Sequence, residues 1–131
     1  MKKLLTIILL LTVSLMADLN WQKEIPAALE LAKKENKIVM VFVEGKDCRW
    51  CKKMKHRILS DEKVDKRLQP YIVVKVMQED KDAVKLLPKI QGVPTIFFMT
   101  SDKKVLQEVI GYFDVDDFVS YIDSVEKIVK K

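Results

Sequence analysis

Short, continuous apolar runs recur along this chain, separated by segments whose apolar residues are spaced three or four positions apart. The runs at residues 37–44, 71–77 and 95–100 are rich in Val, Ile, Phe and Met, which is typical of strands. The first run is almost unbroken, which indicates a strand buried on both faces in the middle of a sheet. After a polar turn at residues 101–104, residues 105–110 are predicted to form the antiparallel hairpin partner of the third run.

The segments between these runs have the apolar spacing of helices. Asn20 is expected to cap a helix over residues 21–35, and a C-terminal amphipathic helix is expected from Asp116 onward. Three shorter helices are predicted at residues 49–59, 60–68 and 80–87. No repeat, low-complexity tract or Pro/Gly-rich linker divides the chain. Residues 18–131 are therefore expected to form one α/β domain, with a monomer as the default state.

The first residues have the pattern of an export signal. A cationic start, Met1-Lys2-Lys3, precedes an apolar stretch that is too short to span a bilayer, and the small residue Ala17 is followed by polar sequence. Residues 1–17 are therefore predicted to be a signal peptide, cut near Ala17, which places the mature protein in the periplasm or outside the cell. An uncleaved membrane anchor is the alternative.

Composition excludes some functions. The 24 Lys and Arg residues against 19 Asp and Glu residues give a net charge of +5, which is too mild to indicate nucleic-acid binding, and the lysines are spread along the sequence. Hydrophobic residues make up 49% of the chain, enough for a core that needs no metal or structural disulfide.

Cys48 and Cys51 are the only cysteines. They follow the first predicted strand and open a predicted helix, where the partial positive charge and free N–H groups favour a thiolate at Cys48. Four nearby cations add to this effect: Lys46, Arg49, Lys52 and Lys53. Because a bridge across two residues closes a very short loop, it would stabilise the fold little, so a redox-active dithiol is favoured over a structural staple.

With this order of elements, Cys48-Arg-Trp-Cys51 resembles the active-site motif of the thioredoxin superfamily, and Gly92-Val93-Pro94-Thr95 resembles its second signature. Gly111 also matches the family pattern. The resemblance implies a thioredoxin fold, a central mixed β-sheet flanked by helices, with a cis peptide bond before Pro94. Within the superfamily, the chain is similar to exported domains such as the C-terminal domain of the membrane-bound thiol:disulfide interchange reductase.

The resemblance also implies a site. Cys48 is expected to attack a partner disulfide and Cys51 to resolve the mixed disulfide, with no cofactor besides this pair. The substrate-binding set is expected to be Trp50, Val93, Pro94 and Thr95, with the Val93 backbone pairing with a substrate strand.

One departure from the family concerns the proton acceptor for Cys51. The superfamily carries a buried Asp in the central strand, and the matching position here is Phe42, or Val41 if the chain is offset by one residue at Gly45. Glu44 is the nearest carboxylate and the candidate substitute, with solvent as the other possibility. An exposed strand-end Glu44 with no catalytic part is the alternative.

Several functions remain open from the sequence. A reductase or electron relay supplied by a membrane electron donor and acting on protein disulfides is favoured, because an exported compartment holds no nicotinamide pool. A disulfide oxidase or isomerase would use the same thiols, and a non-catalytic binding module would keep only the fold. No metal site is expected, since zinc takes four ligands and only His56 joins the cysteines.

Overall fold

Four strands form one mixed sheet in the order β2-β1-β3-β4. The computed structural model describes residues 19–131, so the predicted signal peptide at residues 1–17 lies outside the described residues. The central strand β1 pairs in parallel with β2 and antiparallel with β3, which continues antiparallel to β4. The strands are β1 (Val39–Glu44), β2 (Ile72–Met77), β3 (Thr95–Met99) and β4 (Val105–Ile110). The expected mixed sheet and the expected hairpin are confirmed.

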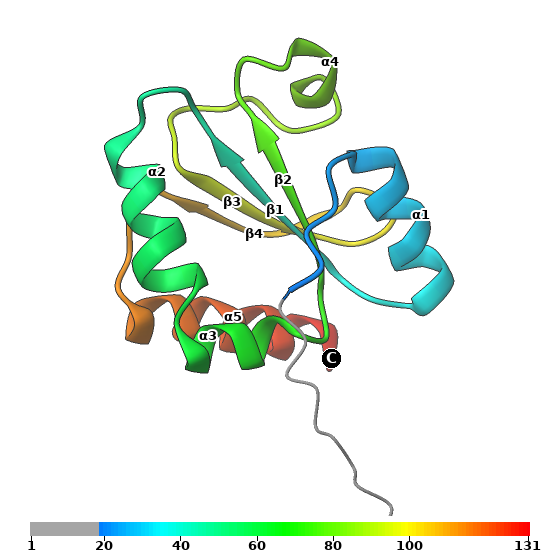
Figure 1. Cartoon of the computed structure of the whole chain (residues 1–131). Coiled ribbons are helices and arrows are strands. Elements are labelled where there is room, and N and C mark those ends of the chain that lie inside the picture. The colour runs from blue at the N-terminus through cyan, green and yellow to red at the C-terminus, as the bar shows by residue number, and fades with distance from the viewer. Residues whose placement is uncertain (1–18) are drawn as a thin grey trace, which may run out of the picture.

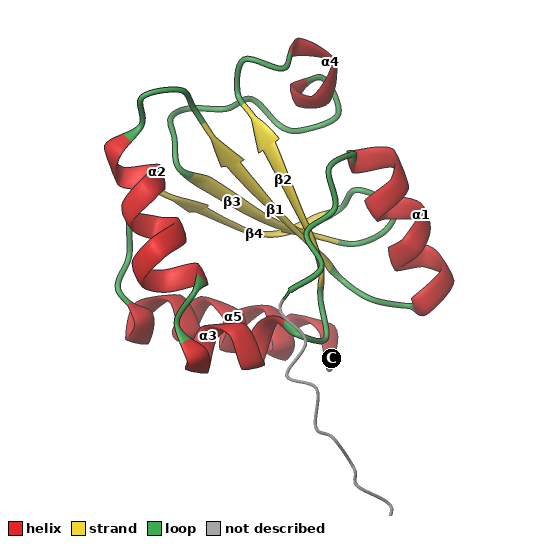
Figure 2. Ribbon diagram, in the orientation of Figure 1, coloured by secondary structure: helices red, strands yellow, loops and turns green. Residues whose placement is uncertain are grey.

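Helices cover both faces of this sheet, as Figures 1 and 2 show. On one side lies α1 (Ile25–Glu35), and the short α4 (Lys81–Val84) lies beyond the end of β2. The other side is covered by α2 (Arg49–Lys53), the π-helix η1 (Met54–Leu59), α3 (Glu62–Leu68) and α5 (Val115–Val129). Within residues 19–131, no helix has both the length and the apolar character needed to cross a membrane.

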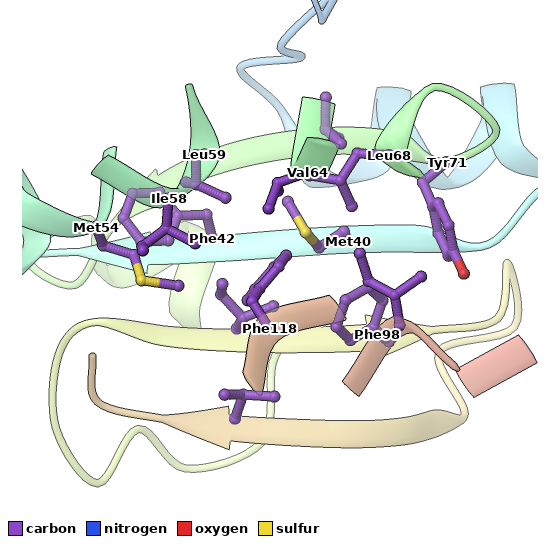
Figure 3. Packing of buried hydrophobic residues seen from close by; sticks show 14 of the residues in the cluster. Met40, Phe42, Met54, Ile58, Leu59, Val64, Leu68, Tyr71, Phe98 and Phe118 are labelled. Atoms are coloured by element: carbon purple, nitrogen blue, oxygen red, sulfur yellow. The ribbon is translucent and has the colours of Figure 1, made fainter. Parts of the chain in front are cut away.

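The side chains of β1 alternate between two hydrophobic clusters. Val39, Val41 and Val43 belong to the cluster under α1, whereas Met40 and Phe42 belong to the cluster under the helices of the other face. All five are completely buried, which confirms that this strand is covered on both faces. Figure 3 shows the second cluster, in which side chains from η1, α3 and α5 meet those of β1 and β3.

The first helix begins later than predicted. It starts at Ile25 and has Pro26 in its first turn, where a missing N–H costs nothing, so the expected cap at Asn20 is wrong. The preceding segment instead extends the sheet. The Gln22 N–H donates to the Val73 carbonyl at 2.8 Å, and the Lys75 N–H donates to the Gln22 carbonyl at 3.2 Å. Sheet pairing along the outer edge of β2 therefore replaces the first helical turn.

Two other predicted helices differ in detail. The helix after Cys48 changes from α to π at Met54, which stacks Leu59 above Met54 and lets both face the core. The helix predicted to reach Leu87 ends at Val84, because the chain tightens into i→i+3 turns before Pro88. There Leu86 N–H donates to Ala83 O, and Leu87 N–H donates to Val84 O, both at 3.1 Å.

Candidate active site

The loop between β1 and α2 places the cysteines beyond the C-terminal end of the central strand β1. A Cβ on Gly45 would lie 2.6 Å from Gln78 Nε2 and 3.2 Å from Val93 Cγ2, so a residue without a side chain fits this crossing. Asp47 then adopts a left-handed conformation, with φ at 52°. Together these two residues turn the chain from the strand into α2.

Cys48 and Cys51 form a disulfide, with their Cα atoms 5.2 Å apart. Cys48 is the N-cap residue of α2, and its Sγ accepts a hydrogen bond from the Cys51 N–H at 3.1 Å. Cys48 is partly exposed, whereas Cys51 is 1% exposed and packs in the cluster under α2 and α5. In the reduced protein this helix N-terminus favours a thiolate on Cys48, because an N–H donor and the positive end of the helix face its sulfur.

The second motif lies beside the first. The Val93–Pro94 peptide bond is cis, and Pro94 is buried. Two hydrogen bonds hold the loop: Thr95 Oγ1 donates to the Gly92 carbonyl at 2.6 Å, and the Gly111 N–H donates to the Pro94 carbonyl at 2.8 Å. Thr95 is completely buried, so its side chain holds this loop in place and offers no surface to a substrate.

Trp50 from the first motif and Val93 and Pro94 from the second line one open hollow of about 340 Å³, together with Gly111 and Tyr112. Trp50 is 51% exposed, and its ring packs against the Tyr112 ring with centroids 5.4 Å apart. Tyr112 was not predicted from the sequence, and its only signal was that it follows Gly111. The hollow presents apolar and aromatic surface next to the disulfide.

The structure also resolves which strand residue faces Cys51. Phe42 shares its cluster with Cys51, whereas Val41 points to the opposite face, toward α1. Phe42 therefore occupies the place of the superfamily's buried carboxylate, and it cannot accept a proton.

Glu44 lies on the same side of β1 as Phe42, two residues further on. Its carboxylate pairs with Lys55 Nζ at 2.7 Å, and its side chain is only 13% exposed. The alternative of an exposed Glu44 is thus wrong. Lys55, on η1, is a residue of this site that the sequence did not reveal, because nothing local connects it to a carboxylate 11 positions away.

His56 is exposed on η1. Among residues 19–131, no group of three or more His, Cys, Asp or Glu side chains is arranged to hold a metal ion.

Comparison with known proteins agrees with this geometry. A family model described as a thioredoxin-like domain matches residues 25–126. The chain belongs to this family. Among curated proteins, this thioredoxin-like protein is 26% identical over 121 residues to Anterior gradient protein 3 of Mus musculus, covering 86% of the chain and 73% of the relative. It is 31% identical over 97 residues to the protein of the same name from Xenopus tropicalis, covering 73% of the chain and 58% of that relative.

Solved structures with the same fold include redox proteins. A thioredoxin from Thermus thermophilus matches with a TM-score of 0.72 and 24% identity, covering 83% of this chain and 88% of that one. The DsbH oxidoreductase matches with a TM-score of 0.70 and 25% identity, covering 85% and 86%. The oxidised C-terminal domain of Neisseria meningitidis DsbD matches with a TM-score of 0.61 and 20% identity, covering 74% and 88%. With its Cys48–Cys51 disulfide, the thioredoxin-like protein is a thiol:disulfide oxidoreductase.

Proposed function

We propose that this thioredoxin-like protein is exported and works as a reductase or electron relay for partner proteins. The observation that carries the proposal is the asymmetry of the dithiol, in which Cys48 is accessible and accepts an N–H hydrogen bond while Cys51 is buried one turn away. This arrangement suits a first attack by one sulfur and an intramolecular second attack by the other.

The exchange proceeds in two steps. The Cys48 thiolate attacks one sulfur of a partner disulfide, a mixed disulfide forms, and the partner's other sulfur leaves as a thiolate that takes up a proton. Cys51 then loses its proton and attacks Cys48 Sγ, which releases the partner's second sulfur. Two electrons pass from the Cys48–Cys51 dithiol to the partner, which leaves as a dithiol.

Glu44 is the candidate acceptor for the Cys51 proton. Its side chain lies on the side of β1 that faces the Cys51 cluster. Lys55 Nζ donates a hydrogen bond to Glu44 Oε1 at 2.7 Å. The ion pair with Lys55 fixes the position of the carboxylate on this side of β1, from where it is proposed to take the proton directly or through a water molecule.

The hollow beside the disulfide is the proposed binding site for the substrate segment. Val93 offers backbone hydrogen-bonding groups at its rim, Pro94 covers the thiols, and Trp50 with Tyr112 supplies aromatic contact. Thr95 supports this surface from below through its hydrogen bond to Gly92.

Export and the membrane electron donor rest on the first 17 residues and on the fold shared with a DsbD domain and with DsbH. Direction remains the main alternative within the same chemistry. The cations that follow Cys48 would stabilise its thiolate, and a more stable thiolate makes a more oxidising protein, as in an oxidase or isomerase. A reduction potential measured against a glutathione series separates a reductase from an oxidant.

The full chain, expressed with its own N-terminus as a Cys51→Ser variant, tests the mechanism directly. The variant is expected to accumulate mixed disulfides with its partners, seen as higher bands on a non-reducing gel that dithiothreitol removes. A Cys48→Ser variant is the matched control and is expected to trap nothing. Absence of any covalent adduct in the Cys51→Ser variant would contradict the exchange mechanism.

A further inference from the structure

The outward face of the active-site helix is basic. Between residues 49 and 57, α2 and η1 carry five Lys or Arg side chains, one His and no acidic residue. Five of these six residues, together with Asp47, line a second open hollow of about 450 Å³: Arg49, Lys52, Lys53, His56 and Arg57. Cations that are spread along the sequence as a whole are thus gathered in space on the helix that carries the disulfide.

Most of this charge has no partner within the described part of the chain. Lys55 is neutralised by Glu44, and Lys53 lies over the Trp50 ring at 4.4 Å from its centroid. Among residues 19–131, the exposed side chains of Arg49, Lys52 and Arg57 make no ion pair. The uncompensated positive charge begins at the residue directly after Cys48.

Helix α5, on the same side of the sheet, has the opposite charge. Helix α5 carries four acidic residues and one lysine, and its Asp123 and Glu126 pair with Arg67 of α3 at 2.6 and 3.2 Å. These contacts raise the pKa of the Arg67 guanidinium above its ordinary value, chiefly through the hydrogen bond to Asp123. Arg67 is thus paired with two carboxylates, whereas the four Lys and Arg side chains that line the hollow on α2 and η1 have Asp47 as the one acidic residue in that lining.

We propose that this basic face of α2 and η1 receives an acidic segment of the partner protein while the partner's disulfide meets Cys48. The inference rests on the proposed function, because the docked molecule must bring a sulfur to the neighbouring exchange site. A protein segment meets this requirement, and a lipid surface or nucleic acid does not. Of the exposed apolar residues, Trp50 lies on α2 beside this face and between the two cysteines, whereas Ile128 and Val129 lie on α5.

The expected energetic effect is mainly on association. Fields of this kind raise encounter rates by roughly 10-fold to 1,000-fold, and they weaken as salt shortens the screening length to about 8 Å at 0.15 M ionic strength. Partners with a neutral or basic segment beside their disulfide are expected to react more slowly, although the chemistry at Cys48 is the same for each.

Three synthetic disulfide peptides test the proposal with the full chain. They share one disulfide-linked fluorescent reporter and differ only in four flanking residues, all Glu, all Ser or all Lys. The reduced protein, used in stoichiometric amounts, is expected to reduce them in the order Glu, Ser, Lys, with about a tenfold difference in the second-order rate constant between Glu and Ser at low salt. The differences are expected to shrink in 0.5 M NaCl.

Reversing two charges on the basic face tests whether this face causes the difference in rate between the three peptides. The double variant K52E/R57E is expected to lose or invert the order of the three peptides. K103E/K104E is the matched control, because it makes the same change in net charge in the β3–β4 turn. That turn lies at the opposite end of the sheet, since Met99 pairs with Val39 and Thr95 with Val43. The control is expected to keep the order.

The outcomes separate the two proposals. Equal rates for all three peptides in the unchanged protein, at both salt concentrations, would overturn this inference and leave the exchange function standing. Failure to reduce any peptide would overturn the proposed function itself. Loss of binding to phosphatidylglycerol vesicles in K52E/R57E, without any peptide preference in the parent, would assign the face to a membrane and also overturn the inference. The rates of the unchanged protein at low salt and in 0.5 M NaCl test the inference even if K52E/R57E fails to fold.

Discussion

The two cysteines have the same chemistry and opposite surroundings. Cys48 caps α2, is partly exposed and accepts an N–H hydrogen bond, whereas Cys51 is 1% exposed and packs with Met54 and Phe42 in the cluster under α2 and α5. Three residues of separation are enough to produce this difference, because one helical turn carries the chain from the capping position to the buried face.

This difference assigns the two roles. Cys48 is partly exposed and Cys51 is buried, so in the proposed mechanism the first bond forms at Cys48 and the second attack comes from inside the molecule. Burial raises the cost of charge on Cys51, whereas the helix N-terminus lowers it on Cys48. The order of the reaction is therefore fixed by the fold and not by the thiols themselves.

The largest effect on this comparison is expected when one cysteine at a time is replaced. In reduced Cys51→Ser, the remaining Cys48 thiol is expected to react with iodoacetamide on the order of 100-fold faster at pH 7 than the remaining Cys51 thiol does in Cys48→Ser. The rates are read by mass spectrometry of the alkylated protein. Both variants are expected to lose catalytic reduction of insulin. Equal alkylation rates would remove the basis for the assigned order.

The pattern of apolar residues was enough to predict most of the fold. Each predicted strand forms within two residues of its expected start, and the hairpin at residues 105–110 has the predicted bounds, because continuous apolar runs leave few alternatives to a buried strand. The predicted start of the first helix was wrong, since Gln22 pairs with β2 through Val73, Val74 and Lys75, which are distant in the sequence and do not influence the local apolar spacing. The π-helix was missed because its helical pattern also fits an α-helix.

The site was less accessible to sequence reasoning than the fold. The cysteines lie in one short motif and Pro94 in another, so the sequence was enough to predict them as site residues. The Glu44–Lys55 pair and the packing of Tyr112 on Trp50 join residues from separate elements, and only the assembled sheet and helices bring them together. Thr95 was expected among the substrate-binding residues, yet its side chain faces the interior, because the position after Pro94 begins the buried strand β3.

A second test weakens the burial of Cys51. Phe42→Ala is expected to lower the free energy of unfolding by about 3–5 kcal/mol and to leave a cavity in the Cys51 cluster. Guanidinium titration measures the stability, and alkylation of reduced Cys51 in the Cys48→Ser background measures its access. We expect alkylation to become about tenfold faster below the unfolding transition, because the cavity exposes the thiol.

Phe97→Ala is the matched control for this test. Phe97 is also completely buried, but it belongs to the cluster under α1, on the opposite face of the sheet. A similar loss of stability without faster Cys51 alkylation is expected. If both variants expose Cys51 equally, the stability of the whole fold and not the local packing of Phe42 protects that sulfur.

A third test concerns the proton that Cys51 must lose. Glu44→Gln is expected to slow resolution of the mixed disulfide on the order of tenfold at pH 7, because the amide cannot accept a proton. The deficit in the rate of resolution should shrink at a pH above the ordinary thiol pKa of about 8.5, because hydroxide from the solvent can then take the Cys51 proton in place of Glu44. Acid-quenched samples, resolved on non-reducing gels, follow the mixed disulfide over time.

Lys55→Gln separates proton transfer from the ion pair. This variant loses the 2.7 Å contact but keeps the Glu44 carboxylate. Its rate of mixed-disulfide resolution is expected to fall less than that of Glu44→Gln. Equal deficits in the two variants would assign the effect to the ion pair that joins β1 to η1, and Glu44 would then be a positioning residue.

The smallest test addresses Trp50, which lies between the two cysteines and shares neither of their environments. Trp50→Ala is expected to lower kcat/KM for a protein disulfide by a few fold, since aromatic contacts contribute about 0.5–1.5 kcal/mol. The rate with bis(2-hydroxyethyl) disulfide should stay unchanged, because this small molecule needs only the Cys48 sulfur. Trp50→Phe keeps an aromatic ring against Tyr112 and should retain most of the activity. Lower activity with both substrates would mean that Trp50 acts on the cysteines themselves. The contrast between the environments of Cys48 and Cys51 would then depend on Trp50.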